Sequence, residues 1–196
     1  EIIVTHNGFH GRTMATVSAT GTPAYREPFE PLVPGFVHID FNDIEALQAA
    51  TTSQTTAVML EPIQAEGGIN VPSDDYLRKV REWCDEQNLL LILDEIQVGM
   101  GRTGTLWAHE QAGIEPDIMT SAKALGGGLP VSALLAKEHA AVFEPGDHGT
   151  TFGGQPLATG AAAYVLRRVI ESDILQNVRE RGMQAMNQLL ALNEQH

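Results

Sequence analysis

The sequence predicts an α/β fold with a largely parallel sheet that is covered by helices on both faces. Strand-like segments alternate with helical segments along the 196 residues, and helical connections are what parallel strands require. The strand-like segments, of which residues 89–93 are the clearest, are apolar without strict alternation, which is typical of strands buried on both faces. Hydrophobic residues make up 43% of the chain and charged residues 19%, so the composition supports one globular core.

The first half of the chain contains short runs of β-branched and apolar residues that predict strands at residues 1–4, 36–39 and 56–60. One helix is predicted within residues 11–20. A second is predicted at residues 43–50, where Asn42 or Asp43 can cap the first turn. Four prolines between residues 23 and 34 predict an extended loop, because proline interrupts regular structure.

The second half of the chain adds predicted strands at residues 89–93, 117–120 and 131–136. The clearest helix is predicted at residues 73–87, with Ser73 as its N-cap. Its residues form one apolar stripe, made of Tyr76, Leu77, Val80, Trp83 and Cys84. Two long helices are predicted at residues 155–170 and 173–192, the second of them amphipathic.

Polar residues stand where three of the buried strands end. Glu61, Asp94 and Thr120 each fall at the carboxyl end of a predicted strand. In parallel α/β sheets the ligand sits beyond these ends. The sequence therefore predicts a functional site at this edge of the sheet.

The charge balance limits the partners. With 12 basic and 25 acidic side chains, the net charge is −13, and such a surface repels nucleic-acid phosphates. Cys84 is the only cysteine, so no internal disulfide can form, which fits a reducing cytosol. No apolar run approaches the roughly 20 residues of a membrane span, and no signal pattern opens the chain. We expect a cytoplasmic protein without nucleic-acid or membrane partners, and a chain that is a piece of a longer protein because it starts without Met.

An acid and a lysine form the most informative pair. Asp94 directly follows residues 89–93, and Lys123 stands among small residues. A buried carboxylate is costly unless cations or donors meet it, and desolvation makes a lysine amine nucleophilic. Pyridoxal phosphate needs both groups, a lysine for its aldehyde and an anion for its ring nitrogen. Alone, Asp94 could cap a turn and Lys123 could be a surface lysine, but together they predict a pyridoxal phosphate site.

Further candidates flank this pair. Gln97 could donate to a phenolic oxygen or cap a turn. Thr150 and Thr151, beside glycines at a helix start, suit a phosphate, although a turn of small residues has the same pattern. Phe9 can stack on a planar cofactor, and Arg12 can bind a carboxylate or lie on a solvated helix start.

A metal site is the competing interpretation of the acids. Glu61 and Glu66 flank Gln64 before the glycine turn at residues 67–68, and with Asp94 they could serve a metal-dependent hydrolase that loses activity to a chelator. No histidine lies nearby at ligand spacing. We therefore predict no metal site.

Several motifs occur in the order seen in class III, pyridoxal-phosphate-dependent aminotransferases, and the chain resembles the acetylornithine aminotransferase branch over nearly its whole length. The motifs are FHGRT at residues 9–13, EPIQAEGG at 61–68, LDEIQ at 93–97, GRTG at 101–104, AKALGGG at 122–128 and TTFGG at 150–154. The resemblance implies the fold type I of pyridoxal-phosphate-dependent transferases. Several motifs in order are far more specific than any one of them.

The resemblance implies roles for five cofactor-binding residues. Lys123 would form the Schiff base and shuttle the proton, so that Lys123 and Asp94 would be the catalytic residues. Asp94 would pair with the pyridinium nitrogen and Gln97 would contact the ring oxygen. Phe9 would stack on the ring. Thr151 would bind phosphate across the interface of a homodimer.

The resemblance also implies substrate contacts. Arg12 would hold the α-carboxylate, Thr150 would lie near the substrate, and Glu66 would help the site to accept both an ω-amine and glutamate. The chain departs from the family pattern at Ala65, Gln155 and Ser121. A methyl group at Ala65 is expected to strain the turn that aims Glu66.

Length is the larger departure, because members of this family are about twice as long. Residues 1–154 are expected to form the core of the large cofactor-binding domain, and residues 155–196 the helices that lead toward a small domain. An N-terminal phosphate turn and a C-terminal arginine lie outside the chain. We expect the chain alone to bind the cofactor poorly.

The expected activity is transfer of the terminal amine of N-acetylornithine to 2-oxoglutarate, in arginine biosynthesis. Succinylornithine, ornithine and 4-aminobutyrate remain as alternative amine donors. An inert truncated remnant is the alternative outside enzymes.

Overall fold

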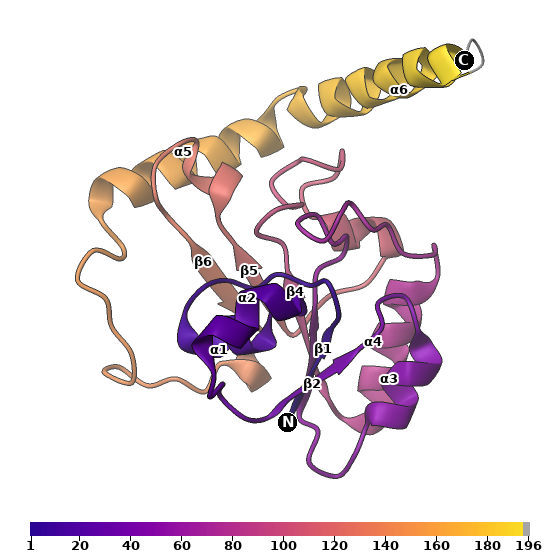
Figure 1. Cartoon of the computed structure of the whole chain (residues 1–196). Coiled ribbons are helices and arrows are strands. Elements are labelled where there is room, and N and C mark those ends of the chain that lie inside the picture. Colours follow the sequence, from indigo (N-terminus) through magenta and orange to yellow (C-terminus); the bar gives the residue numbers. More distant parts are fainter. Residues whose placement is uncertain (194–196) are drawn as a thin grey trace.

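The computed structural model describes residues 1–193 and contains one six-stranded sheet in the order β2-β1-β3-β4-β5-β6 (Figure 1). The strands are β1 (Ile2–Thr5), β2 (Phe36–Ile39), β3 (Ala57–Leu60), β4 (Leu90–Asp94), β5 (Ile118–Ser121) and β6 (Ala133–Ala136). Every neighbouring pair is parallel except β5 and β6. The predicted α/β fold with a largely parallel sheet is confirmed.

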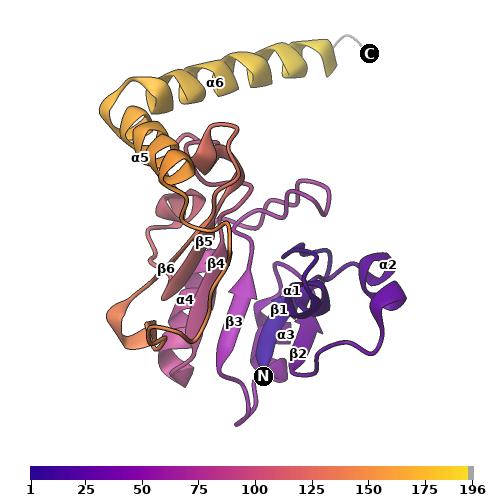
Figure 2. The same ribbon diagram turned by 90° about the vertical axis from the view of Figure 1, so that its left-hand side faces the viewer.

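Helices flank the sheet and extend beyond one end of it. The α-helices are α1 (Met14–Ala19), α2 (Pro23–Arg26), α3 (Ile44–Ala50), α4 (Tyr76–Gln87), α5 (Pro156–Glu171) and α6 (Ile174–Asn193). The 3-10 helices are η1 (Glu27–Phe29), η2 (Ala108–Ala112), η3 (Lys123–Gly126) and η4 (Glu138–Ala140). Figures 1 and 2 show α3 and α4 on one face of the sheet, α1 and α2 on the other side, and α5 and α6 above the strands. Among residues 1–193, no helix has the length and hydropathy to cross a membrane.

Local chemistry explains where the predicted helices begin and end. Asp43 caps α3, since its Oδ1 accepts a hydrogen bond from the backbone N–H of Ala46 at 2.8 Å. Helix α4 ends at Asn88, whose φ of 55° places it in the left-handed region that asparagine tolerates.

Two predictions about the connections are wrong. Ser73 does not cap α4, because Asp75 occupies the N-cap position and the Ser73 hydroxyl donates to Asn42 Oδ1 at 2.9 Å. Residues 23–34 are not wholly extended, because they contain α2 and η1. Proline is favoured in the first turn of a helix, where its missing N–H is not needed, and Pro23 starts α2 in this way.

The main hydrophobic core lies between the sheet and helices α3 and α4. It includes Leu47, Val80 and Cys84 from the helices and Leu60 and Leu91 from the strands, all with 0% exposure. The apolar stripe predicted for α4 therefore faces the sheet. Burial of such side chains, about 25 cal/mol per Å² of apolar surface, is the main force that holds this layer together.

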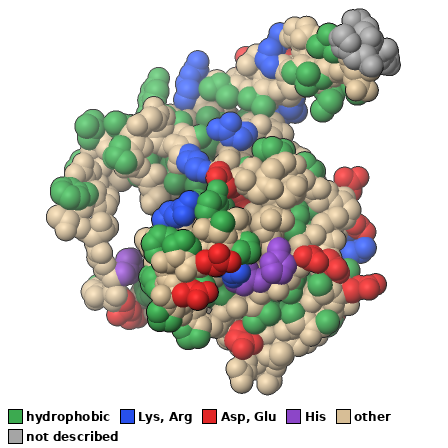
Figure 3. Space-filling model, viewed as in Figure 1, with side chains coloured by type: hydrophobic (Ala, Val, Ile, Leu, Met, Phe, Trp, Pro, Cys, Tyr) green, Lys and Arg blue, Asp and Glu red, His purple; other side chains and the backbone are tan. Residues whose placement is uncertain are grey.

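A second cluster joins α5 to the loops at the carboxyl ends of β4 and β5. Buried Ala162 and Val169 of α5 pack with Met100 and Leu125. This contact fixes the loop after β4 and the η3 turn, which carries Lys123. Helix α6 has no buried residue, and Figure 3 shows hydrophobic side chains along it.

The order in which strands are added to the sheet changes side between β1 and β3. From β1 the chain moves to β2 on one side, and it then crosses to β3 on the other side. Such a switch point leaves a crevice beyond the carboxyl ends of the two strands, and ligands bind there in open α/β sheets. The segment that begins at Phe9 follows β1, and Glu61 follows β3.

Candidate active site

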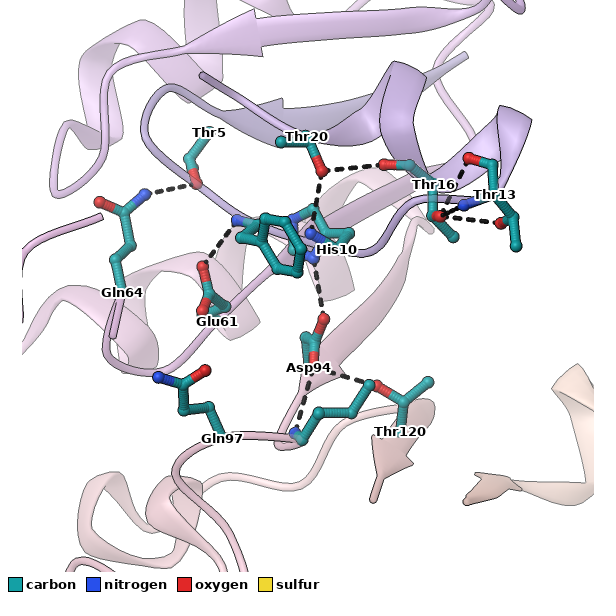
Figure 4. A network of polar contacts seen from close by, with 12 residues as sticks. Thr5, His10, Thr13, Thr16, Thr20, Glu61, Gln64, Asp94, Gln97 and Thr120 are labelled. Atoms are coloured by element: carbon teal, nitrogen blue, oxygen red, sulfur yellow. Dashed lines mark hydrogen bonds and ion pairs between the residues drawn. The ribbon is translucent and has the colours of Figure 1, made fainter. Parts of the chain in front are cut away.

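The predicted polar strand ends lie side by side. Leu60 of β3 is paired with Leu93 of β4, and Asp94 is paired with Thr120 of β5. Glu61 therefore stands next to Asp94, which stands next to Thr120, as Figure 4 shows. The sequence prediction of a site at this edge of the sheet is supported by this arrangement.

Asp94 is the centre of a polar network (Figure 4). Its side chain is buried, and its Oδ2 lies 2.9 Å from His10 Nδ1. Its Oδ1 accepts hydrogen bonds from the Ile96 N–H at 3.1 Å and the Thr120 hydroxyl at 3.3 Å. These contacts compensate for removing the carboxylate from water, so an anion can be held here in a fixed orientation.

His10 is the residue of this network that the sequence reasoning missed. It is 6% exposed, and its backbone N–H donates to Thr20 Oγ1 at 3.1 Å. Gly11 makes the turn after it possible, because φ is +128° and a Cβ would come within 2.7 Å of Thr16 Oγ1. Only its position next to Phe9, just after the first strand, could have identified it.

Glu61 is a second buried acid beside this pair. Its Oε2 accepts a hydrogen bond from the Phe9 N–H at 3.0 Å, so it fixes the backbone that presents the Phe9 ring. Burial raises the pKa of Glu61 to about 7, although the Phe9 N–H and His10 oppose this shift, and the neighbouring Asp94 adds to it. Near neutral pH, this position can therefore hold a proton.

Lys123 stands at the start of η3, where the chain leaves β5. Its φ of 44° is in the left-handed region, which is uncommon for a residue other than glycine and is associated with functional sites. Its amine donates a hydrogen bond to Gln97 Oε1, so the structure brings these two predicted residues together. The expectation of an amine removed from water is wrong for this chain, because the Lys123 side chain is exposed.

Phe9 and Arg12 lie together after β1. The Arg12 guanidinium carbon is 5.6 Å from the centre of the Phe9 ring. The Phe9 backbone is tied to Glu61, and Phe9 adjoins His10, which binds Asp94. The structure therefore groups the aromatic and cationic candidates at the same strand ends as Asp94.

Glu66 lies on an exposed turn that follows β3. Gln64, with 0% exposure, anchors this turn through hydrogen bonds to Thr5 Oγ1 at 3.0 Å and to the His6 carbonyl at 2.7 Å. The strain expected at Ala65 is wrong, because Ala65 is not among the residues with positive φ. Positive φ values fall instead on Gly68 and Ile69.

Within residues 1–193, Thr150 and Thr151 lie apart from the other predicted site residues. Both are exposed on the segment between η4 and α5, and no hydrogen bond in the described part of the chain joins either to the Asp94 network. Figure 1 shows this segment looping outward beside β6. The chain thus groups the residues predicted to bind the cofactor's ring without the threonines predicted to bind its phosphate.

The chemistry of this group fits pyridoxal phosphate. A held carboxylate, an aromatic ring and a lysine amine beside an amide lie at neighbouring strand ends, and these are the groups that the cofactor's ring and aldehyde require. Over the described residues 1–193, no group of three or more His, Cys, Asp or Glu side chains is arranged to hold a metal ion.

Comparisons with known proteins place the chain in one family. The family model for aminotransferase class-III matches residues 1–196. The acetylornithine aminotransferase of Gloeobacter violaceus is 57% identical over 185 residues, covering 94% of this chain and 46% of the relative. The chain thus spans about half the length of the curated relatives that it matches.

Solved structures agree with this assignment. The N-acetylornithine aminotransferase of Stenotrophomonas maltophilia K279a matches with a TM-score of 0.77 and 39% identity, covering 99% of this chain and 45% of that one. The ornithine aminotransferase of Toxoplasma gondii, described with partial occupancy of PLP at its active site, matches with a TM-score of 0.90 and 38% identity. That match covers 94% of this chain and 44% of the Toxoplasma chain. The chain therefore has the fold of type I transferases and belongs to the class-III aminotransferases, whose cofactor is pyridoxal phosphate.

Proposed function

We propose that the whole protein containing this chain transfers the terminal amine of N-acetylornithine to 2-oxoglutarate. The observation that carries the proposal is the meeting of Asp94, His10 and Phe9 with the Lys123–Gln97 pair at adjoining strand ends. The donor is proposed from the relatives, which are acetylornithine aminotransferases at 46% to 57% identity. The activity would serve arginine biosynthesis in the cytoplasm.

The cofactor-binding roles follow from charge and geometry. Asp94 would keep the ring nitrogen protonated, and His10 would hold the Asp94 carboxylate in place. Phe9 would stack on the ring, and Gln97, whose Oε1 accepts a hydrogen bond from the Lys123 amine, would donate its side-chain N–H to the ring oxygen. When bound, pyridoxal phosphate supplies the aldehyde and the electron-withdrawing ring that amino-group transfer needs.

Lys123 and Asp94 would be the catalytic residues. The Lys123 amine would hold the cofactor through its aldehyde, and as a free amine it would carry the proton removed from the carbon that bears the donor's amine. The η3 turn supports this role, since packing against α5 holds its backbone while the long side chain remains exposed.

The substrate contacts are proposed for residues on exposed segments. Arg12 would bind the α-carboxylate of the amine donor, because a guanidinium matches a carboxylate with two parallel hydrogen bonds. Glu66, on the turn anchored by Gln64, would help to accept both substrates, and Thr150 would lie near the substrate.

The assembly and domains are part of the same proposal. Thr151 would bind the phosphate in the site of a second copy, so the enzyme would be a homodimer with its sites at the interface. The exposed position of Thr151, outside the Asp94 network of its own chain, supports this arrangement. Residues 1–154 would form the core of the large domain, and residues 155–196 would lead to a small domain. Residues 194–196 of this segment lie outside the described residues.

Steady-state kinetics tests the donor. The whole protein, loaded with cofactor and 2-oxoglutarate, is assayed for glutamate formation with N-acetylornithine, succinylornithine, ornithine and 4-aminobutyrate. We predict a kcat/KM for N-acetylornithine at least about 10-fold above each other donor. A higher value for another donor would overturn the donor assignment. Loss of all activity, together with no spectral change on adding cofactor, would show an inert remnant instead.

A further inference from the structure

Tyr25 lies against Arg12, the proposed carboxylate-binding residue. The Arg12 guanidinium carbon is 4.1 Å from the centre of the Tyr25 ring. The Tyr25 ring also meets the Phe9 ring edge to face, with 6.0 Å between their centres and an angle of 86°. The guanidinium therefore rests on an aromatic pair, and the Tyr25 ring is its nearer member.

The Arg12 guanidinium keeps its hydrogen-bond donors for a ligand. Within residues 1–193, the ion pairs and side-chain hydrogen bonds of the structure do not include Arg12. An aromatic face attracts the cation through the ring electrons and does not occupy its N–H groups as a carboxylate would. The contact thus restrains Arg12 and leaves it ready to bind an anion.

The position of Tyr25 is built by the fold. Helix α2 carries Tyr25 and also Arg26, which contacts both ring nitrogens of His38 on β2 at 2.9 and 3.0 Å. Burial and the Arg26 charge lower the pKa of His38 to about 4, so His38 is neutral at pH 7 and does not repel Arg26. The His38 ring also lies 3.3 Å from the Thr20 carbonyl, just before α2. These contacts fix α2 to the sheet and hold the Tyr25 ring beneath Arg12.

We propose that Tyr25 is a positioning residue that orients Arg12 and thereby sets the affinity for the α-carboxylate of the amine donor. This inference rests on the proposed function, in which Arg12 binds that carboxylate. Restraining the flexible arginine before binding removes part of the entropy cost of ordering it in the complex. Because Arg12 is exposed, its contact with the aromatic ring corresponds to about a 2- to 5-fold effect on affinity.

Two donors that differ only by the α-carboxylate can measure the contribution of that group to binding. N-acetylputrescine is N-acetylornithine without its α-carboxylate, and the two compounds share the terminal amine and the acetyl group. The whole protein with bound cofactor is assayed with both donors in the parent, Tyr25→Leu and Tyr25→Phe forms. Phe29→Leu is the control, since Phe29 lies on the adjoining η1 and its ring is not among the aromatic contacts of Arg12 within residues 1–193.

We expect Tyr25→Leu to raise KM for N-acetylornithine by about 2- to 5-fold with kcat unchanged. Tyr25→Phe should retain the parent KM, because it keeps the aromatic face. KM for N-acetylputrescine should be the same in all forms. Equal increases in KM for both donors, or no increase for N-acetylornithine, would overturn the proposal, because a residue that only packs would not distinguish the carboxylate.

Arg12→Met separates failure of this inference from failure of the proposed function. If Arg12→Met raises KM for N-acetylornithine but Tyr25→Leu does not, Tyr25 has no positioning role and the Arg12 assignment stands. If Arg12→Met leaves that KM unchanged, Arg12 is not the carboxylate-binding residue, and both assignments are wrong. If N-acetylornithine is not a donor, the same comparison is made with ornithine and putrescine, which also differ only by the α-carboxylate.

Calorimetry provides a measurement that does not depend on turnover. N-acetylnorvaline keeps the α-carboxylate of N-acetylornithine but has no amine to transfer. Its Kd should rise in Tyr25→Leu by the same factor as the KM and remain unchanged in Tyr25→Phe and Phe29→Leu. An unchanged Kd in Tyr25→Leu would contradict the proposal.

Discussion

Glu61 is the residue whose ionisation has the clearest consequence for stability. It is 4% exposed beside Asp94, and its pKa is raised to about 7, chiefly by burial. A carboxyl group with a raised pKa in the folded state binds its proton more tightly when folded. Its ionisation therefore opposes folding, and the free energy of unfolding falls as pH rises through the interval between the unfolded and folded pKa values.

Glu61→Gln should remove this pH dependence. Between about pH 4.5 and 7, the parent should lose stability relative to the variant, reaching a difference of roughly 3 kcal/mol above pH 7. Urea unfolding at a series of pH values measures the difference, with the exposed Glu82→Gln on α4 as the control. Parallel stability curves for the parent and Glu61→Gln would contradict the raised pKa, because they would show that folding does not change the pKa of Glu61.

At the scale of elements, Asp117 joins four segments at the amino end of β5. Its Oδ2 accepts hydrogen bonds from the Leu91 N–H of β4 and from Arg81 of α4, both at 2.8 Å, and its Oδ1 lies 3.1 Å from His139 of η4. Burial raises its pKa, but the Leu91 N–H and Arg81 outweigh this effect, and the pKa of Asp117 is lowered overall. The stability contributed by Asp117 is present above the pKa of the unfolded state and is lost as pH falls through the folded value.

Asp117→Asn should lower the free energy of unfolding at pH 7 by about 2 kcal/mol or more, because Arg81 then loses its buried anion. The loss should shrink at acid pH, where the parent carboxylate is also protonated. Denaturant unfolding at pH 7 and below measures both effects. Asp75→Asn, which alters an exposed pair with Lys79, is the control and should have little effect. A penalty that is constant with pH would contradict the ionic role of Asp117.

Local sequence patterns were sufficient to predict most helices and strands. Contacts between residues that are far apart in the sequence could not be predicted from such patterns. The apolar strand pattern correctly predicted that Glu61, Asp94 and Thr120 lie together, because parallel strands end at the same edge of a sheet. The His10–Asp94 contact spans 84 residues, and the left-handed turn at Lys123 depends on packing between η3 and α5. Neither is encoded in a short segment. Helix α2 was not predicted for a similar reason. The prolines of this segment predict a loop, but the contact of Arg26 with His38 of β2 stabilises a helix there.

At the scale of the whole molecule, the chain brings together the residues proposed to contact the ring of the cofactor. These proposed ring- and aldehyde-binding residues lie at the ends of β1, β3, β4 and β5, and α5 packs against the loops after β4 and β5. The exposed Thr150 and Thr151 lie elsewhere, and the chain spans about half the length of its relatives. We therefore expect strong cofactor binding only in the whole, assembled protein.

The central claim is that Lys123 holds the cofactor beside Asp94. The most direct test is to reduce the cofactor-loaded whole protein with borohydride, digest it and locate the stable pyridoxyl group by mass spectrometry. We predict the group on Lys123, and its loss in Lys123→Ala. A label on Lys79 or Lys137, the other lysines of this chain, or a label that persists in Lys123→Ala, would contradict the account.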